Sequence, residues 1–189
     1  MGTQFEHMLI ACPECKAKAS MVETVEEVPN FGKVLISTIK CSSCGYRMTD
    51  VMSVELRGPM LFSKKISGPK DIYAKIVRNS SATVEVPELG VKIFPGPKAE
   101  GFISNVEGLL ERIENAVGII ARSEKGAKKK NAEKKLAEIL MAKEGKKKIT
   151  VKLLDPFGAS AIIGGKVTKK KLSKKEAGKL KKNILVFEK

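Results

Sequence analysis

The order of apolar and polar residues gives the first part of the chain the character of β-strands. Residues 19–28 and 33–40 are rich in apolar and β-branched types, and the segment 29–32 between them contains proline and glycine. Such a pattern predicts two strands joined by a turn as a β-hairpin. Strand character continues through residues 46–56 and ends at the sequence Arg57-Gly58-Pro59.

Residues 60–94 predict a second β region. Short apolar runs alternate there with turn-forming residues, and the runs cover residues 61–66, 72–78, 82–86 and 91–94. Short strands at this spacing are typical of a β-barrel or a sandwich-like body.

The period of the apolar positions changes after residue 97. Apolar residues then recur every three or four positions, which predicts a helix; they are Val106, Leu109, Leu110, Ile113, Val117 and Ile120. Ser104 and Glu107 predict a capping box at its start. A second helix is predicted from about residue 128 to 144, beyond the break at Gly126. The two would form a helical hairpin at about 104–144.

Strand character returns in residues 149–154 and 160–163. The helical hairpin is therefore predicted to be an insertion within the β body. Ser173 and Glu176 predict the capping box of a short helix that ends near Leu180, and residues 184–187 predict a last strand.

The four cysteines form two Cys-x-x-Cys motifs, Cys12 with Cys15 and Cys41 with Cys44. Each motif places two sulfurs on one side of a tight turn, so the two together can complete the tetrahedral shell of a zinc ion. The predicted hairpin lies between them. Four thiolates leave no open coordination position, so we expect a structural zinc site and not a catalytic one.

Other uses of these cysteines are a redox dithiol or two disulfides. The first seven residues contain no apolar signal segment, which favours a reducing, cytoplasmic location and argues against disulfides. A thioredoxin-type site also needs only one such motif. His7, the only histidine, is either an alternate metal ligand or a solvated residue in a loose N-terminus.

Together these patterns predict a mostly β fold with some α structure. Residues 1–57 would form a four-cysteine zinc ribbon. Residues 58–189 would form the β body with its helical hairpin and a basic C-terminal segment. No apolar run reaches the roughly 18 residues that a membrane helix requires, so no membrane contact is expected.

The net charge of +15 is concentrated in the last third of the chain. Residues 1–121 contain 14 basic residues (Lys and Arg) and 14 acidic residues (Asp and Glu). Residues 122–189 contain 22 basic and 7 acidic residues. Lysine runs attract phosphate, which suggests RNA or ribosome contact. Arg122 is the only arginine there and aromatic residues are few, which disfavours base reading and stacking. A solvated lysine-rich surface and steering toward an acidic partner remain open.

The sequence contains no recognisable catalytic set. It has one histidine, no glycine-rich phosphate loop, and no aspartate paired with a neighbouring acid. A binding protein is therefore expected, and not an enzyme.

Several stretches of the chain form a recognisable set, and they are residues 12–15, 29–34, 41–47, 80–90, 94–97, 101–103, 106–110 and 155–158. The most specific are the Pro-Glu-Leu-Gly and Val-Glu-Gly-Leu-Leu segments. Together these stretches resemble the ZPR-type zinc-finger protein family, and the resemblance covers about residues 11 to 165 in unbroken order. The resemblance implies a four-cysteine ribbon followed by a double-stranded β-helix with an inserted helical hairpin. It also implies binding to translation elongation factor one alpha, which eukaryotic members bind.

This chain departs from the eukaryotic pattern in two ways. It has one ribbon and one β body, as archaeal members do, where eukaryotic relatives resemble a tandem of two modules. It also has Ala159-Ser160 after the Asp-Pro-Phe-Gly turn, where the family tends to have Asn-Ser. Partner surfaces built from both modules are not expected here.

The expected partner is thus a translation elongation factor, which the chain would bind or help to fold. Phe31, at the Asn30-Phe31-Gly32 tip of the hairpin, is a candidate anchor for a partner pocket. The alternative is that Phe31 folds back onto the β body. Glu88 and Leu89 are candidates for a recognition edge, with a purely structural turn at residues 87–90 as the alternative.

Overall fold

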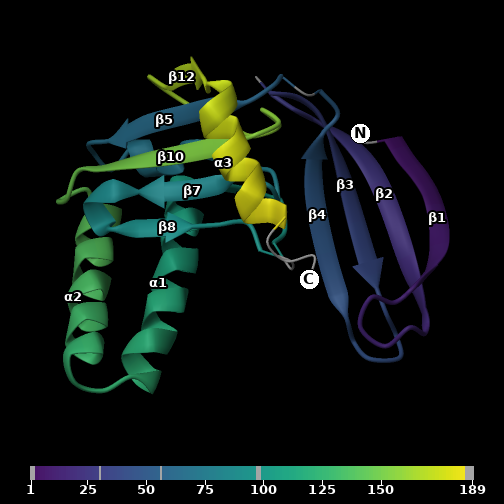
Figure 1. Ribbon diagram of the computed structural model, residues 1–189, viewed down its shortest axis with the longest axis horizontal. Helices are drawn as coiled ribbons and strands as arrows, with labels where there is room; N and C mark the ends of the chain where they lie inside the picture. The colour runs from purple at the N-terminus through teal and green to yellow at the C-terminus, as the bar shows by residue number, and fades with distance from the viewer. Residues whose placement is uncertain (1–2, 30, 56, 97–98, 186–189) are drawn as a thin grey trace.

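The computed structural model describes residues 3–29, 31–55, 57–96 and 99–185. In the described residues the chain forms two β units side by side, with helices on the second (Figure 1). The N-terminal unit is an antiparallel sheet in the order β1-β2-β3-β4. Its strands are β1 (Thr3–Ala11), β2 (Lys18–Val28), β3 (Gly32–Lys40) and β4 (Arg47–Ser53). The predicted hairpin is β2 and β3, which pair from Val28 opposite Gly32 to Ser20 opposite Lys40.

Strand β1 shows that the expectation of a loose N-terminus was wrong. Residues 3–11 pair with β2, and His7 lies opposite Val22 with an exposed side chain. The strand is at the edge of its sheet, and Leu9 is 74% exposed. Because an edge strand need not bury its side chains, its sequence showed little of the periodicity that marks a strand.

The second unit contains two sheets, one in the order β12-β5-β10-β7-β8 and one in the order β11-β6-β9. Short strands folded into two sheets form a jelly-roll body, so the predicted fold class is confirmed. The strands are β5 (Met60–Ile66), β6 (Lys75–Arg78), β7 (Thr83–Val86), β8 (Val91–Ile93), β9 (Phe102–Asn105), β10 (Ile149–Asp155), β11 (Ala161–Ile163) and β12 (Thr168–Lys171). Two 3-10 turns, η1 (Asp71–Tyr73) and η2 (Pro87–Leu89), connect them.

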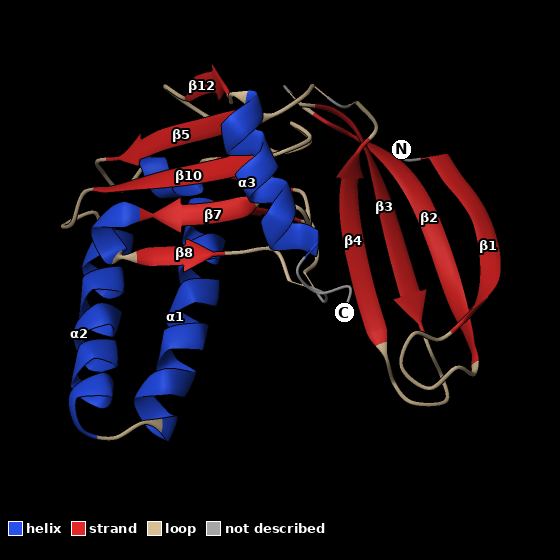
Figure 2. Cartoon of the chain, viewed as in Figure 1, coloured by secondary structure: helices blue, strands red, loops and turns tan. Residues whose placement is uncertain are grey.

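Helices α1 (Val106–Ser123) and α2 (Gly126–Lys143) form the inserted hairpin, which projects from one side of the body (Figure 2). The residue that caps α1 is Asn105, whose side chain accepts a hydrogen bond of 2.8 Å from the backbone N–H of Gly108. The predicted capping box at Ser104 was wrong because β9 extends through Asn105, so the helix begins only at Val106 and the residue directly before it is Asn105.

Helix α3 (Lys174–Leu185) crosses the five-stranded sheet on the side facing the viewer in Figure 1. Its predicted capping box is confirmed, because Ser173 and Glu176 exchange hydrogen bonds between side chain and backbone. The helix continues to Leu185, so a strand starting at residue 184 was wrong. The rest of that predicted strand, residues 186–187, lies outside the described residues.

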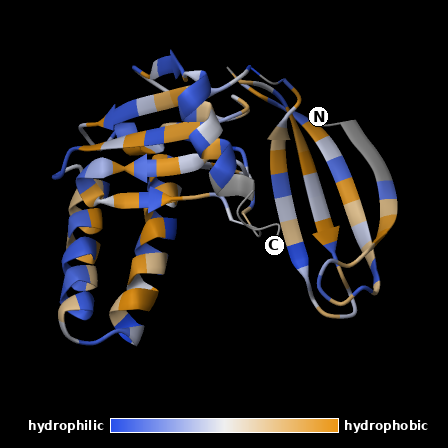
Figure 3. Cartoon of the chain, in the orientation of Figure 1, coloured by the Kyte–Doolittle hydropathy of each residue, from blue (hydrophilic) through white to orange (hydrophobic). Residues whose placement is uncertain are grey.

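Two apolar clusters hold the fold together. Within the body, the sheets and the helical hairpin enclose the larger core, with Phe62, Leu109 and Ile139 among its buried residues. A second cluster joins the two units: Val28, Phe31, Val34 and Val51 from the ribbon pack with Val77 and Ala161 from the body. The two units are therefore fixed against each other by buried contacts. The alternation of hydrophobic and hydrophilic residues along the strands is visible in Figure 3.

Candidate metal centre

The two cysteine motifs form turns with nearly the same hydrogen bonds. The backbone N–H of Cys12 donates to the carbonyl of Ala17, and that of Lys16 donates to the carbonyl of Cys12. In the second turn Cys41 donates to Tyr46, and Gly45 donates to Cys41. Lys16 and Gly45 occupy equivalent positions with φ of 63° and 74°. This left-handed conformation favours glycine, and Lys16 adopts it without glycine's freedom.

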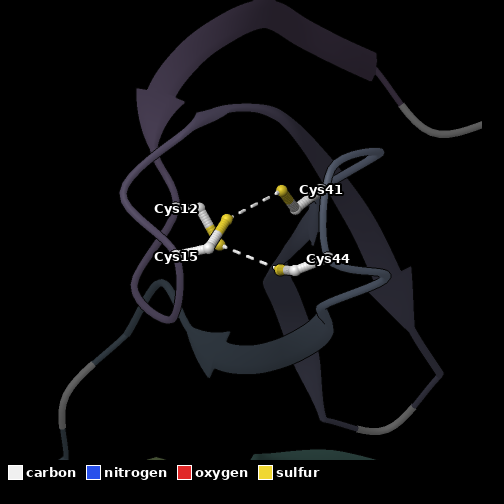
Figure 4. Close-up of side chains that lie close together, drawn as sticks. All are labelled: Cys12, Cys15, Cys41 and Cys44. Atoms are coloured by element: carbon white, nitrogen blue, oxygen red, sulfur yellow. Dashed lines mark hydrogen bonds between the residues drawn. The ribbon is translucent and has the colours of Figure 1, made fainter.

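The turns bring all four sulfurs together at the end of the ribbon, as Figure 4 shows. Their Sγ atoms lie within 4.8 Å of one another. The Sγ atoms of Cys12 and Cys44 are 3.7 Å apart, and those of Cys15 and Cys41 are 3.6 Å apart. Four sulfurs around zinc at a bond length of about 2.3 Å would be separated by about 3.8 Å. The geometry therefore fits a tetrahedral zinc ion.

The surroundings of the sulfurs explain why a metal is needed. Cys12 and Cys41 are buried with Ala19 in a small cluster, whereas Cys15 and Cys44 are exposed. A core of this size supplies little stability by itself. Backbone N–H groups, that of Cys44 first, lower the pKa of Cys41 to about 6. The Tyr46 N–H favours the Cys44 thiolate, but the neighbouring thiols raise the pKa of Cys44 to about 12.

These opposite pKa shifts mean that Cys41 and Cys44 do not ionise together without a cation. A divalent metal supplies the positive charge that holds all four as thiolates. The donor set is soft and closed, which suits structural zinc, and the prediction of zinc as the cofactor is confirmed. In the part of the chain that the structure describes, no other group of three or more such side chains could hold a metal, and His7 is not part of this one.

Phe31 lies in the interior and offers no surface to a partner. Its side chain is 3% exposed, in the cluster that joins ribbon and body. Arg57 covers it: the guanidinium lies 5.4 Å from the ring centroid and donates to the Phe31 carbonyl at 2.7 Å. The exposed-anchor prediction is corrected accordingly, because Phe31 folds back onto the body. Asn30 lies outside the described residues.

Glu88 and Leu89 belong to a structural turn. Leu89 is buried in the main core. Both carboxylate oxygens of Glu88 accept hydrogen bonds from Thr150, one from the backbone N–H at 2.9 Å and one from the hydroxyl at 2.7 Å. Partial burial raises the pKa of Glu88, but the bonds from Thr150 outweigh it and hold that pKa below its usual value. A recognition role for Leu89 is therefore wrong, and Glu88 is occupied within the molecule.

The sequence analysis missed the residues that join the two units. Asp50 accepts hydrogen bonds from the backbone N–H groups of Val51 and Gly101 and from the hydroxyl of Ser80. Gly101 and Gly158 lie so close to the ribbon and its linker that a Cβ at either would overlap the carbonyl oxygen of Val51 or Gly58. Gly101 lies within one of the stretches that resemble the family, but that stretch does not by itself indicate a contact.

Many lysines of the basic third are neutralised locally. Lys135 and Lys147 both contact Glu138, and Lys143 contacts Glu114. Strand β12 differs, because its residues, Thr168 to Lys171, are all exposed. At the edge of a sheet, exposed lysines hinder pairing with another chain.

Fold and metal centre together define a four-cysteine zinc-ribbon protein with a jelly-roll body. Residues 4–56 match the model of the ZPR1 zinc-finger domain, and residues 70–181 match that of the ZPR1 jelly-roll domain. The chain belongs to the ZPR1 family.

Similar proteins occur in archaea and in eukaryotes. A ZPR1-like protein of Methanocaldococcus jannaschii is 43% identical over 94% of this chain and 91% of its own length. A ZPR1-like protein of Pyrococcus horikoshii is 42% identical over 90% of this chain and 79% of its own length. The zinc finger chaperone zpr1 of Schizosaccharomyces pombe is 27% identical over 80% of this chain but only 34% of its own length. The archaeal proteins thus share nearly the whole architecture, and the yeast protein is much longer.

The yeast relative is named a zinc finger chaperone, and a human relative, 25% identical over 85% of this chain and 35% of its own length, is named zinc finger protein ZPR1. In the described residues, no helix is both long and apolar enough to span a bilayer.

Proposed function

We propose that this chain is a zinc-dependent, non-enzymatic binding protein that acts on a translation elongation factor of the one alpha type, as an adaptor or folding factor. The observation that carries the proposal is the closed four-sulfur centre on a ribbon packed rigidly against a jelly-roll body of the ZPR1 family. A closed centre leaves no position for substrate, so the metal shapes a binding surface.

The name of the yeast relative supports a chaperone-like role, since that protein is called a zinc finger chaperone. The resemblance to the ZPR-type family described above is the reason for proposing an elongation factor as the partner. The four cysteines form no disulfide, which agrees with a reducing compartment, and we propose the cytoplasm.

Phe31 is buried, so we do not include it in the proposed partner surface. Exposed apolar residues remain on both units, including Leu9 and Val54 on the ribbon and Ile119 on α1. Single exposed apolar residues are normal on soluble proteins, so they do not by themselves locate the interface.

A second candidate is RNA or ribosome contact through lysines. The observation that favours it is the exposed run Lys169-Lys170-Lys171 on β12, followed directly by α3 with Lys174 and Lys175 exposed at its start. The lysines that are paired with acids on α1 and α2 weaken it, because paired charges attract phosphate less.

The two candidates are distinguished by capture of tagged, zinc-loaded protein from native lysate, with and without nuclease. We expect the elongation factor to be retained after nuclease treatment and in about 0.5 M salt. If lysines bind RNA, affinity falls with salt by a log-log slope of about −0.7 to −0.9 per phosphate neutralised. Steep salt dependence, with loss of the elongation factor after nuclease, would reverse the ranking.

A further inference from the structure

The two edges of the five-stranded sheet differ in how they are protected. The β12 edge carries three exposed lysines, as described above. The opposite edge is β8, which pairs on one side with β7, and no described strand pairs with its other side. Lys92, the one lysine of β8, is held by Glu85 at 2.7 Å. The β8 edge therefore exposes backbone hydrogen-bonding groups without free charged side chains to guard them.

A groove of about 610 Å³ lies along this edge, between β8 and helix α1. Figure 1 shows β8 as the last strand of the sheet, with α1 running away beneath it. Val91 and Ile93 line the strand side. Ile113, Val117 and Ile120 line the helix side, one helical turn apart, and Ile120 is 47% exposed. An apolar channel thus runs beside an open strand edge.

One end of the groove is positively charged. Phe102 lines it there, between two guanidinium groups: that of Arg112 lies 4.6 Å and that of Arg78 5.8 Å from the ring centroid. Arg78 is buried and donates to the carbonyls of Ala82 and Glu100. Burial and then the charge of Arg112 lower the pKa of Arg78.

Arg112 is exposed, and among the described residues no carboxylate forms an ion pair with it. Glu100 is the one acid of the groove lining, set against Arg78, Lys92 and Arg112. The two like charges around Phe102 would be stabilised by an incoming anion.

We propose that this groove binds an extended segment of a partner polypeptide, which adds to β8 as a further strand, packs alternate apolar side chains against α1 and places a carboxylate beside Arg112. The open strand edge selects an extended backbone, because a helix has no free groups to pair with it. The apolar helix face selects the side chains on one face of that strand. The positive charge of Arg112 favours a partner segment that carries an acidic side chain at the matching position. The proposal holds whether or not the partner is an elongation factor.

The test uses zinc-loaded full-length protein and a set of labelled ten-residue peptides. Each peptide alternates valine and threonine and carries one aspartate, moved through the valine positions, so that its carboxylate lies on the face that packs against α1. Matched sets carry lysine in place of aspartate, or proline at alternate positions, which prevents strand pairing. Binding is measured by fluorescence anisotropy, and exchange of the β8 amides is followed by NMR.

The best aspartate peptide should bind at least tenfold more tightly than its lysine and proline counterparts, and should slow exchange of β8 amides. Arg112→Gln should weaken it at least fivefold and Arg122→Gln, on the same helix, should not. Arg112→Glu should reverse the preference toward the lysine peptide.

Two neighbouring isoleucines distinguish binding in the groove from non-specific hydrophobic binding. Ile120→Ser should weaken binding at least fivefold, whereas Ile119→Ser should leave it unchanged, because Ile119 is 59% exposed and does not line the groove. Both variants are checked for unchanged melting temperature. The proposal is overturned if no peptide binds below 1 mM, if the two isoleucine variants behave alike, or if β8 exchange does not change. It is equally overturned if sedimentation shows that the chain dimerises and amide exchange shows that the β8 edge is the dimer interface.

Discussion

The carboxylate of Asp50 accepts a hydrogen bond of 2.7 Å from the backbone N–H of Gly101. Asp50 lies on β4 of the ribbon, and Gly101 directly precedes β9 of the jelly-roll body. The same carboxylate also accepts the N–H of Val51 and the hydroxyl of Ser80. One side chain thus ties the two units together where the backbones of Val51 and Gly101 lie close to each other. The body, and not only the metal, determines how the ribbon is oriented.

Replacing Gly101 with alanine should loosen this contact. A Cβ there would overlap the carbonyl oxygen of Val51 and crowd the Asp50 carboxylate. Overpacking of this kind costs about 1–3 kcal/mol. We expect Gly101→Ala to lower the free energy of unfolding by that amount in urea titrations. Gly68→Ala is the control, because no atom lies within 4 Å of a Cβ there. Equal stability of the two variants would contradict the contact.

Phe31→Ala should destabilise the fold and leave partner affinity unchanged in the molecules that remain folded. Removing a buried phenylalanine costs about 3–5 kcal/mol. Leu9→Ala, at an exposed position of the same ribbon, should change stability by less than about 0.5 kcal/mol. Thermal melting and binding are measured together. Normal melting with loss of binding would restore Phe31 as a partner anchor.

The ion pair between Lys64 and Asp71 should make the stability of the fold depend on pH in the acidic range. Lys64 is buried, and its Nζ lies 2.9 Å from the Asp71 carboxylate. The hydrogen bond from Lys64, followed by that from the Ser67 N–H, holds the pKa of Asp71 below its usual value. A lowered folded-state pKa stabilises the fold above the unfolded pKa of about 3.9. That stability is lost as pH falls from there through the folded-state pKa.

Asp71→Asn tests this pair directly. The variant leaves the Lys64 charge buried without its partner, which should cost about 3 kcal/mol near pH 7. The difference from the wild type should shrink as pH falls below about 4, where the wild type also loses the charge. A difference between the two proteins that stays constant from pH 7 to pH 3 would show that the ion pair does not stabilise the fold.

Removal of zinc should unfold the ribbon and spare the body. The core of the ribbon around the cysteines is small, so the metal–thiolate bonds provide much of the ribbon's stability. We expect one zinc per chain by elemental analysis, and loss of NMR signal dispersion for the ribbon with a chelator or in Cys41→Ser. Ser42→Ala, at an exposed neighbour, is the control. Substoichiometric zinc in reduced protein, or a folded ribbon in Cys41→Ser, would refute the assignment.

The metal centre and the hairpin could be predicted because local rules determine them. The spacing of Cys12, Cys15, Cys41 and Cys44 is a property of tight turns, and the turn at 29–32 is signalled by proline and glycine. The capping box at Ser173 is equally local. The apolar period of α1 was visible because one face of that helix packs on the core.

Other features depend on tertiary contacts that no local pattern reveals. Ser104 has the sequence of a helix cap, but the pairing of β9 with β6 extends through Asn105, so the helix begins at Val106 and Asn105 is its cap. Phe31 sits at a turn, where an apolar residue could face water or a partner. Its burial follows from Val77 and Ala161 of the body, which are distant in sequence. The hydrogen bond between Asp50 and Gly101 is invisible for the same reason.

The central claim, that the chain binds a translation elongation factor, is tested most directly by titration calorimetry. Purified zinc-loaded protein is titrated with purified elongation factor of the one alpha type in about 0.5 M salt, where phosphate contacts are weak. We expect a complex with a dissociation constant of about 10 μM or tighter, which is abolished when zinc is removed. No heat of binding at protein concentrations up to about 100 μM, with intact zinc and fold, would contradict it.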